Sequence, residues 1–378
     1  MAILALLMGL LATVVPCRGC PSELCRCSTR NVIVCSHRRL ERVPHFAREL
    51  DKLYEELDLS QNDIYAIPPY AFEDLLVKSI VLNNNPLIGI SPRAFDGIEK
   101  NLAKVDLHSA SLDVLHWGVF RKLHRLVELN LADNNLFALP MGLFAGTTGL
   151  VTLTFQGNKI SILRRGTFRG LRNVRTLDLS DNRISVIEDD AFEDLRHLAV
   201  LNLKENILTT LNYRAISGLD SLEELYLDHN RLSDISPSPF SLLPSLITAS
   251  LQANNLSSLH SQTFSGAPSL HHLYLDNNIL QNISNNAFAG INRLQTLSLE
   301  NNRVETLGDT CTPPGLKSLT TLKLADNPLD CSCRIGWIYG LILQTGAFVS
   351  GRCENPVQHK DVLLRQLNFT LCLVTNCT

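Results

Sequence analysis

The sequence predicts a solenoid in which each coil adds one short strand to a parallel β-sheet. Three observations carry this prediction. An apolar pattern ending in asparagine occurs in VRTLDLSDNRISVI and again, 24 residues later, in LAVLNLKENILTTL. A phenylalanine follows most of these asparagines by ten residues, and no cysteine occurs between Cys35 and Cys311. A fixed period of this length is typical of stacked coils.

The first residues, MAILALLMGLLATVVPCRG, form an apolar run that ends in small residues. They predict a signal peptide over residues 1–19, because roughly a dozen apolar residues are too few to cross a bilayer. Cleavage after Gly19 would begin the mature chain at Cys20, whereas cleavage nearer Val15 would keep Cys17. Since no later stretch forms an uncharged membrane span or a lipid-anchor tail, we expect a secreted, extracellular protein without a membrane span.

The region after the leader divides into a cap, a repeat array and a second cap. Residues 20–52 form a cysteine-rich N-terminal cap, residues 53–328 hold twelve repeats, and residues 329–378 form a cysteine-rich C-terminal cap and tail. An open solenoid exposes its core and a strand edge at each end, which invites aggregation. A small cap buries too little apolar surface to be stable alone, so disulfides are expected there.

The repeat follows L-x-x-L-x-L-x-x-N-x-L, with eight consecutive steps of 24 residues from Ala110 to Asn302. Leu177 and Leu179 should point inward from a short strand while Asp178 between them points outward. One such strand cannot bury its apolar face alone, whereas stacked strands can. The eleven repeat asparagines are Asn62, Asn85, Asn134, Asn158, Asn182, Asn206, Asn230, Asn254, Asn278, Asn302 and Asn327.

Two internal columns should fill the coils. The asparagines predict a ladder, because a buried amide can both donate to and accept from backbone groups. Ala110 interrupts this ladder. Ser109 and Ser111 are candidate replacement hydrogen-bond partners, but a local irregularity of the coil is the favoured expectation. The phenylalanines predict a stacked spine in which Ile216 replaces one member and the repeat of Cys311 lacks one; its members are Phe72, Phe95, Phe120, Phe144, Phe168, Phe192, Phe240, Phe264 and Phe288.

This pattern resembles the secreted extracellular leucine-rich repeat proteins with typical 24-residue repeats, such as Slit-like, acid-labile-subunit-like and Toll-receptor-ectodomain-like proteins. The resemblance implies a leucine-rich repeat solenoid, or horseshoe. A parallel β-sheet lines its concave face, irregular segments with short 3-10 or turn structure form its convex face, and disulfide-stapled caps close both ends. The family pairs cap cysteines first with third and second with fourth, which implies Cys20–Cys27, Cys25–Cys35, Cys331–Cys353 and Cys333–Cys372.

Cys311 and Cys377 fall outside the cap pattern. One hypothesis is an extra bridge, Cys311–Cys377, that ties the tail to the last repeats. The alternatives are an intermolecular bridge through Cys377 or a buried, free Cys311 that packs as a small apolar residue. Zinc binding by the C-terminal cysteines is the weaker alternative to disulfides, because a secreted chain without C-x-x-C pairs is a poor candidate for a zinc site.

The sequence gives no sign of catalysis. It contains no H-E-x-x-H, G-x-S-x-G, Walker loop or G-x-G-x-x-G, and its eleven histidines are scattered. We therefore expect a protein that is not an enzyme and needs no metal or cofactor. The net charge of −3 argues against a general affinity for nucleic acid or acidic membranes.

The variable outward positions of the strands suit a binding surface. The best candidate is centred on Tyr226 and Tyr274, because tyrosine combines a large contact area with a polar tip and is enriched at binding hot spots. An ordinary preference of tyrosine for strands is the alternative explanation. The flanking candidate residues, among which histidine could confer pH sensitivity, are Glu224, Asp228, His229, His272 and Asp276.

A second candidate surface is basic. It could attract sulfated polysaccharide, although acidic residues of the next repeat, Glu188, Asp189 and Asp190, favour neutralisation instead. Its members are Arg164, Arg165, Arg169, Arg172 and Arg175.

Four N-glycosylation sequons fit an oxidising extracellular compartment. They begin at Asn255, Asn282, Asn368 and Asn376. A glycan on Asn255 would lie near the tyrosines and could cover part of the proposed surface.

The expected function is a secreted, non-enzymatic scaffold that binds an extracellular protein on its concave sheet. Family resemblance implies extracellular-matrix, adhesion, growth-factor-carrier or innate-immune roles. Two alternatives remain, namely the ectodomain or soluble form of a receptor, and a regulatory subunit of a secreted enzyme. Fold alone does not choose among them.

Overall fold

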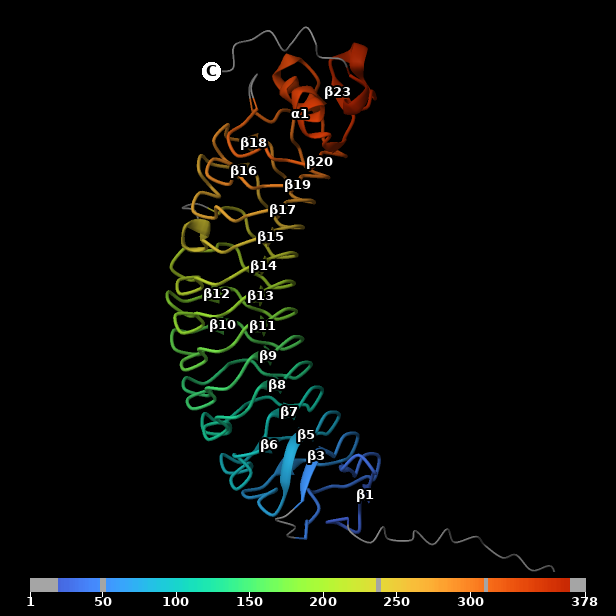
Figure 1. The fold of residues 1–378 in the computed structure, drawn as a ribbon, viewed down its shortest axis with the longest axis vertical. Helices are drawn as coiled ribbons and strands as arrows, with labels where there is room; N and C mark the ends of the chain where they lie inside the picture. The colour runs from blue at the N-terminus through green and yellow to red at the C-terminus, as the bar shows by residue number, and fades with distance from the viewer. Residues whose placement is uncertain (1–19, 48–51, 236–238, 309–311, 368–378) are drawn as a thin grey trace, which may run out of the picture.

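The computed structural model describes residues 20–47, 52–235, 239–308 and 312–367. This part of the chain forms a curved solenoid whose two ends bend toward the same side (Figure 1). Its main sheet has fifteen strands in the order β1-β2-β3-β5-β7-β8-β9-β11-β13-β14-β15-β17-β19-β20-β22. The β1–β2 pair is antiparallel, and every later pair in this sheet is parallel.

The elements of the main sheet are short and evenly spaced. Their bounds are β1 (Arg26–Cys27), β2 (Val32–Val34), β3 (Leu53–Asp58), β5 (Leu76–Val81), β7 (Lys104–Asp106), β8 (Glu128–Asn130), β9 (Thr152–Thr154), β11 (Thr176–Asp178), β13 (Val200–Asn202), β14 (Glu224–Tyr226), β15 (Thr248–Ser250), β17 (His272–Tyr274), β19 (Thr296–Ser298), β20 (Thr321–Lys323) and β22 (Phe348–Ser350). Twelve of these strands, β3 to β20, come from the predicted repeats.

The 24-residue period fixes the register of the sheet. Leu177 of β11 pairs with Leu201 of β13, so equivalent residues of successive repeats lie side by side. Leu177 and Leu179 are completely buried while Asp178 between them is half-buried. Because side chains alternate along a strand, the leucines form one continuous core and the residues between them face the concave side.

The asparagine ladder joins neighbouring coils through backbone groups. Nδ2 of Asn182 donates to the carbonyls of Phe155 at 2.9 Å, Leu179 at 3.2 Å and Ser180 at 3.0 Å. Its Oδ1 accepts from the amide of Ile160 at 3.0 Å. One buried side chain thereby satisfies backbone groups in two coils, as the sequence predicts.

Ala110 interrupts the ladder without leaving its neighbour unsatisfied. The amide of Leu87, whose equivalents donate to a ladder asparagine, donates instead to the backbone carbonyl of Ala110 at 2.9 Å. The amide of Ala110 in turn donates to Oδ1 of Asn134 at 3.1 Å. Replacement by Ser109 or Ser111, the less favoured of the two alternatives, is therefore wrong for this bond, because the backbone carbonyl of Ala110 accepts it.

The phenylalanine spine fills the half of the core away from the sheet. Rings of successive coils stack, with centroids 5.8 Å apart for Phe72 and Phe95 and 5.7 Å apart for Phe168 and Phe192. Ile216 takes the missing place and is fully buried. An aliphatic side chain therefore keeps the core closed where the ring column stops.

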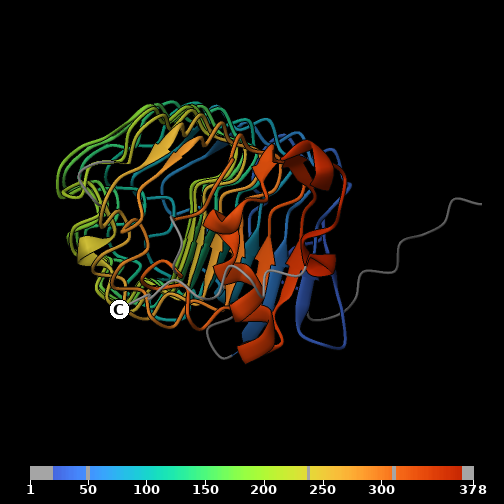
Figure 2. The ribbon, with the colours of Figure 1, turned by 90° about the horizontal axis from the view of Figure 1, so that it is seen from above.

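The coils carry little regular structure away from the main sheet. Short parallel pairs lie on an adjoining flank (Figure 2), and one 3-10 helix, η1, spans Pro239–Leu242. The pairs are β4 (Ala66–Ile67) with β6 (Gly89–Ile90), β10 (Ile162–Leu163) with β12 (Val186–Ile187), and β16 (Ser258–Leu259) with β18 (Asn282–Ile283). This agrees with the expected irregular convex side and adds the flank pairs to it.

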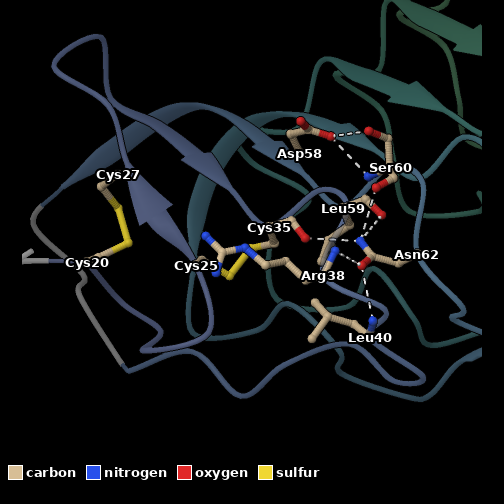
Figure 3. Close-up of a disulfide and its surroundings, with 10 residues drawn as sticks. All are labelled: Cys20, Cys25, Cys27, Cys35, Arg38, Leu40, Asp58, Leu59, Ser60 and Asn62. Atoms are coloured by element: carbon tan, nitrogen blue, oxygen red, sulfur yellow. Dashed lines mark hydrogen bonds between the residues drawn. A yellow bond between two sulfur atoms is a disulfide. The ribbon is translucent and has the colours of Figure 1, made fainter. Parts of the chain in front are cut away.

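The N-terminal cap is held together by disulfides and is joined to the first repeat by hydrogen bonds (Figure 3). Disulfides link Cys20 to Cys27 and Cys25 to Cys35. The first ladder asparagine, Asn62, donates to the carbonyl of Cys35 at 3.1 Å and accepts from the amides of cap residues 38 and 40 at 2.9 and 3.1 Å. The ladder therefore begins on the cap itself.

The C-terminal cap covers the other end of the core. It consists of β21 (Leu329–Asp330), η2 (Cys333–Ile335), α1 (Trp337–Thr345), β22, β23 (Cys353–Asn355), η3 (Val357–His359) and η4 (Leu364–Gln366). A disulfide joins Cys331 to Cys353. The buried Trp337 donates from Nε1 to the carbonyl of Leu307 at 2.7 Å and so fixes α1 against the last repeats.

Several predicted features lie outside the described residues. Cys333 is disulfide-bonded, whereas its expected partner Cys372 lies beyond the described part of the chain. The same is true of the leader, of Cys17, Cys311 and Cys377, and of the sequons at Asn368 and Asn376. With Cys331, Cys333 and Cys353 held in disulfides, these sulfurs are not the thiolates that a zinc site needs.

Candidate concave binding site

The central outward column of the concave sheet has the predicted register. Tyr226 of β14 pairs with Ser250 of β15, which pairs with Tyr274 of β17. Since adjacent strands lie about 4.8 Å apart, the two tyrosine backbones are separated by roughly 10 Å. Both tyrosine side chains are half-buried, and Ser250 between them is buried at 4% exposure.

Tyr226 is held on two sides. Its hydroxyl donates to Oε2 of Glu224 at 2.8 Å, and Nζ of Lys204 lies 4.4 Å from its ring centroid. Burial first, and then the hydrogen bond to Glu224, raise the pKa of Tyr226 from 10.0 to about 12. The phenol is therefore neutral at physiological pH and its ring is already oriented, which lowers the entropic cost of binding.

Asp228 supports the surface from below. It is buried at 5% exposure, and its Oδ1 accepts from the hydroxyl of Ser250 and, at 3.1 Å, from the amide of Gln252. Its Oδ2 lies 3.2 Å from Nζ of Lys204. The carboxylate thus joins three successive coils and lies beneath the contact surface rather than at it.

The second tyrosine has a similar support. Oδ1 of Asp276 accepts from the hydroxyl of Ser298 at 2.5 Å and from the amide of Glu300 at 2.7 Å. Asp276 therefore occupies in its coil the place that Asp228 occupies two coils earlier. Unlike Asp228 it is half-buried, so it lies closer to the contact surface.

The two candidate histidines differ in position. His272 is half-buried, and its Nδ1 is enclosed without a hydrogen-bond partner. Burial, followed by the neighbouring His271, lowers the pKa of His272 below 6.5, so the ring is neutral at pH 7. His229 is exposed on the loop beyond β14 with a φ of 54° and lies at the margin of the candidate surface.

Sequence reasoning missed Lys204, which contacts both the ring of Tyr226 and the carboxylate of Asp228. A signal for it exists in the repeat. Lys204 precedes Asp228 by 24 residues and so occupies the equivalent position in the preceding coil. Side chains at equivalent positions of adjacent parallel strands are neighbours, so opposite charges there predict a pair.

The concave face continues into the C-terminal cap. Phe348 of β22 pairs with Thr321 of β20 and is 56% exposed. It borders an open depression of about 650 Å³ between the turn after β20 and the cap, whose walls include Arg352, Glu354 and Arg365. An aromatic side chain and both signs of charge therefore extend the candidate surface beyond the repeats.

The arginine cluster is partly neutralised by the next coil. Arg164 lies 3.6 Å from Glu188, and Arg165 lies 3.6 Å from Asp190 and 3.3 Å from Glu193. These pairs are largely exposed and contribute little stability. They nevertheless offset two of the five positive charges, as the preferred interpretation of the sequence expects.

The described residues contain no group of three or more His, Cys, Asp or Glu side chains placed to hold a metal ion. Over the same ranges, no helix combines the length and apolarity needed to cross a bilayer.

Comparison with known proteins identifies the class to which this solenoid belongs. A leucine rich repeat family model matches six overlapping segments, 100–160, 124–184, 172–232, 220–278, 244–304 and 268–329. The chain belongs to the leucine-rich repeat family. Leucine-rich repeat-containing protein 3 of Danio rerio is 32% identical over 132 residues, which cover 34% of this chain and 48% of that protein. This chain thus matches about half the length of that relative.

Solved structures show the same fold over most of the chain. A chain in the octameric complex of latrophilin 3, Unc5D and FLRT2 (LRR) is 26% identical, with a TM-score of 0.68, covering 94% of this chain and 99% of that one. A chain of the Drosophila Toll–Spatzle complex is 21% identical, with a TM-score of 0.58, covering 83% and 54%. A chain of the LRIM1/APL1C complex is 22% identical, with a TM-score of 0.57, covering 73% and 53%. These chains adopt the extracellular type of repeat solenoid, and they were solved in complexes with other proteins.

Proposed function

We propose that this chain is a secreted, non-enzymatic scaffold that binds an extracellular protein on its concave sheet around Tyr226 and Tyr274. The observation that supports this most directly is the fixed ring of Tyr226, held between Lys204 and Glu224 before any ligand arrives. Rigid tyrosines with satisfied polar tips are favoured in protein interfaces. Bonds between Asp228, Ser250 and Gln252 further fix the strands beneath.

A receptor role is the second candidate. The similar chain from the latrophilin 3, Unc5D and FLRT2 complex, matched over 94% of the present chain, favours a ligand-binding ectodomain or the soluble form of an adhesion receptor. A transcript that continues beyond Thr378 into an apolar membrane span would support this candidate. The role of a regulatory subunit would instead require copurification with a hydrolytic enzyme.

The experiment is a comparison of two double variants secreted from eukaryotic cells. Tyr226→Ala/Tyr274→Ala removes the candidate contacts, whereas Val81→Ala/Thr154→Ala changes the same column in earlier coils. Partners cross-linked from extracellular extract are identified by mass spectrometry, purified, and measured by surface plasmon resonance. We expect a partner whose affinity falls at least about tenfold, or 1.4 kcal/mol, in the tyrosine variant and stays unchanged in the control. Equal affinity of both variants would overturn the assignment.

A further inference from the structure

A row of exposed apolar side chains crosses the first four coils on the flank that follows the asparagine turns. We name it the apolar flank. Its members are Tyr65, Ile88, Val114 and Phe137, which are 40%, 78%, 53% and 56% exposed. Tyr65, Ile88 and Phe137 each lie three residues after the repeat asparagine, and Val114 lies four residues after Ala110.

The flank is one continuous surface, because neighbouring coils are bonded along it. The amide of Ile88 donates to the carbonyl of Tyr65 at 2.8 Å, and β4 pairs with β6 beside them. The amide of Asn135 donates to the carbonyl of Leu112 at 2.8 Å in the next two coils. Equivalent positions in stacked coils lie about 4.8 Å apart, so Tyr65 and Ile88 are neighbours and Phe137 continues the same line two coils further on. In the coil between them Asp113 occupies the equivalent position, and the exposed Val114 lies one residue beyond it.

Later coils do not continue the row. Three residues after the asparagine, the next five repeats carry Ser161, Ser185, Thr209, Ser233 and Ser257. Coil packing tolerates small polar residues there, so the core does not require apolar ones in the first four coils. At this repeat position exposed apolar residues occur only in the first four coils, whereas one residue further on, at the offset of Val114, Val186 of a later coil is also 47% exposed. The concentration of apolar side chains at one end of the molecule indicates a covering partner.

Charge is also sparse on this flank. The outward positions of this flank lie one, three and four residues after the repeat asparagine or, in the third coil, after Ala110. At these positions the first four coils contain no basic residue, and their two acidic residues are Asp63 and Asp113. The next two coils begin the same segment with Lys159 and Arg183. An uncharged apolar surface is complementary to itself, as a two-fold contact between identical chains requires.

We propose that the apolar flank is the homodimer interface of this protein, formed with a second copy in antiparallel orientation. In a two-fold contact centred between the second and third coils, coil one faces coil four and coil two faces coil three. Asp63 then faces the coil of Asn135, and Asp113 faces the coil of Ile88, so the two carboxylates do not oppose each other. Like charges are kept apart while the four apolar side chains meet their counterparts.

The exposed area of these four side chains can be compared with the area that a standard protein interface buries. Taking about 200 Å² for each aromatic side chain, Tyr65 and Phe137 together expose roughly 190 Å², and the smaller side chains of Ile88 and Val114 add to this with 78% and 53% of their surface. A standard interface buries about 800 Å² on each partner. The apolar row is therefore the centre of such an interface, and the small neighbours Ala66, Pro86 and Ala138 lie within its rim.

The sequons of the repeat array fall at the opposite end of the same flank. Asn255 and Asn282 lie one and four residues after their repeat asparagines, and both side chains are exposed. A glycan at either site would prevent contact at that end. Because the interface occupies the first four coils, glycosylation at these positions is compatible with the dimer.

The test is the oligomeric state of the secreted, glycosylated protein, measured by sedimentation velocity over a micromolar concentration series. Ile88→Glu/Phe137→Glu changes two members of the row. Ser161→Glu/Thr209→Glu is the matched control, because both serine and threonine are exposed, occupy the same repeat position, and lie two coils apart as Ile88 and Phe137 do. We expect a dimer for the parent and the control, and a dissociation constant at least about tenfold higher for the flank variant.

Three outcomes would overturn the proposal. They are a parent that stays monomeric throughout the series, a flank variant that dimerises like the parent, and a control that loses the dimer equally. The concave variant Tyr226→Ala/Tyr274→Ala should keep the dimer, because its changes lie on the main sheet. Loss of dimerisation and loss of ligand binding are therefore separable.

Discussion

The buried carboxylate of Asp228 illustrates how single residues shape this surface without meeting a ligand. Its bonds to Ser250 and Gln252 and its contact with Lys204 use both oxygens. Asp228 is buried whereas Lys204 is 39% exposed, so this charge pair is only partly buried. We therefore regard Asp228 as a support for Tyr226, and Tyr226, Glu224 and Tyr274 as the contact residues.

Tyr226 should titrate unusually late. Its pKa is raised to about 12 by burial and by Glu224, while the unfolded chain ionises near 10, so the neutral phenol stabilises the fold below pH 10. That contribution is lost as the pH rises from 10 through 12. In ¹³C-tyrosine NMR we expect Glu224→Gln to lower the Tyr226 midpoint toward 10, because the negative charge that the phenol hydrogen-bonds is removed. A midpoint near 10 in the parent protein would contradict the bonded geometry.

At the residue scale, the sequence predicts which side chains share the concave column but not how deeply each is buried. Register follows from the period alone, so the positions of Tyr226 and Tyr274 were predictable. The burial of Ser250 and Asp228 depends on rotamers chosen by neighbours in three coils. The spacing of the repeats does not determine these rotamers. The structure shows that Asp228 is buried, so it does not belong to the contact surface.

At the scale of the repeating element, the ladder shares its acceptors between coils. The carbonyl of Phe155 accepts from both Asn158 and Asn182, and the carbonyl of Leu179 accepts from Asn182 and Asn206. The amide of Ile160, by contrast, donates to Asn182. A single substitution therefore leaves the carbonyls partly bonded but takes the ladder acceptor from a buried amide.

Asn182→Ala should lower the free energy of unfolding by about 2–4 kcal/mol, because several buried hydrogen bonds are lost and one amide is left without its acceptor. Asn173→Ala is the control, since its exposed side chain donates one bond, to the carbonyl of Thr148 at 2.8 Å. Urea unfolding with the disulfides intact measures both. A loss for Asn182→Ala that is no larger than the control's would show that the ladder is dispensable.

The sequence predicts the twelve repeat strands of the main sheet from their period, and it fails where backbone atoms replace a side chain. At Ala110, chemistry suggested that nearby serine hydroxyls would bond, yet the alanine carbonyl accepts from Leu87. Such a substitution depends on a small backbone adjustment that no residue type encodes. The flank strands were likewise unforeseen, because two-residue pairs leave almost no periodic signal.

At the scale of the whole molecule, contacts are almost entirely between adjacent coils. The main sheet pairs each of its strands with the preceding and following strand of that sheet, and the core consists of several parallel columns of leucines beside a column of rings. Stability in such an array is close to a sum of coil and interface terms. A destabilising substitution should therefore affect mainly its own coil and the adjacent ones, and each cap should stabilise mainly the coils next to it.

The N-terminal cap tests this one-dimensional behaviour. Cys25–Cys35 is buried and closes a ten-residue separation, so Cys25→Ser/Cys35→Ser should cost about 3 kcal/mol in the cap. Hydrogen exchange should accelerate in β1 to β3, because Asn62 bonds to the cap through Cys35, and stay unchanged in β13 to β15. The half-buried disulfide Cys20–Cys27 serves as the comparison. We expect Cys20→Ser/Cys27→Ser to accelerate hydrogen exchange in β1 to β3 less than Cys25→Ser/Cys35→Ser does. Acceleration that is uniform across all fifteen strands would mean that the solenoid unfolds as one cooperative unit, and that the cap stabilises the distant concave site as strongly as its own coil.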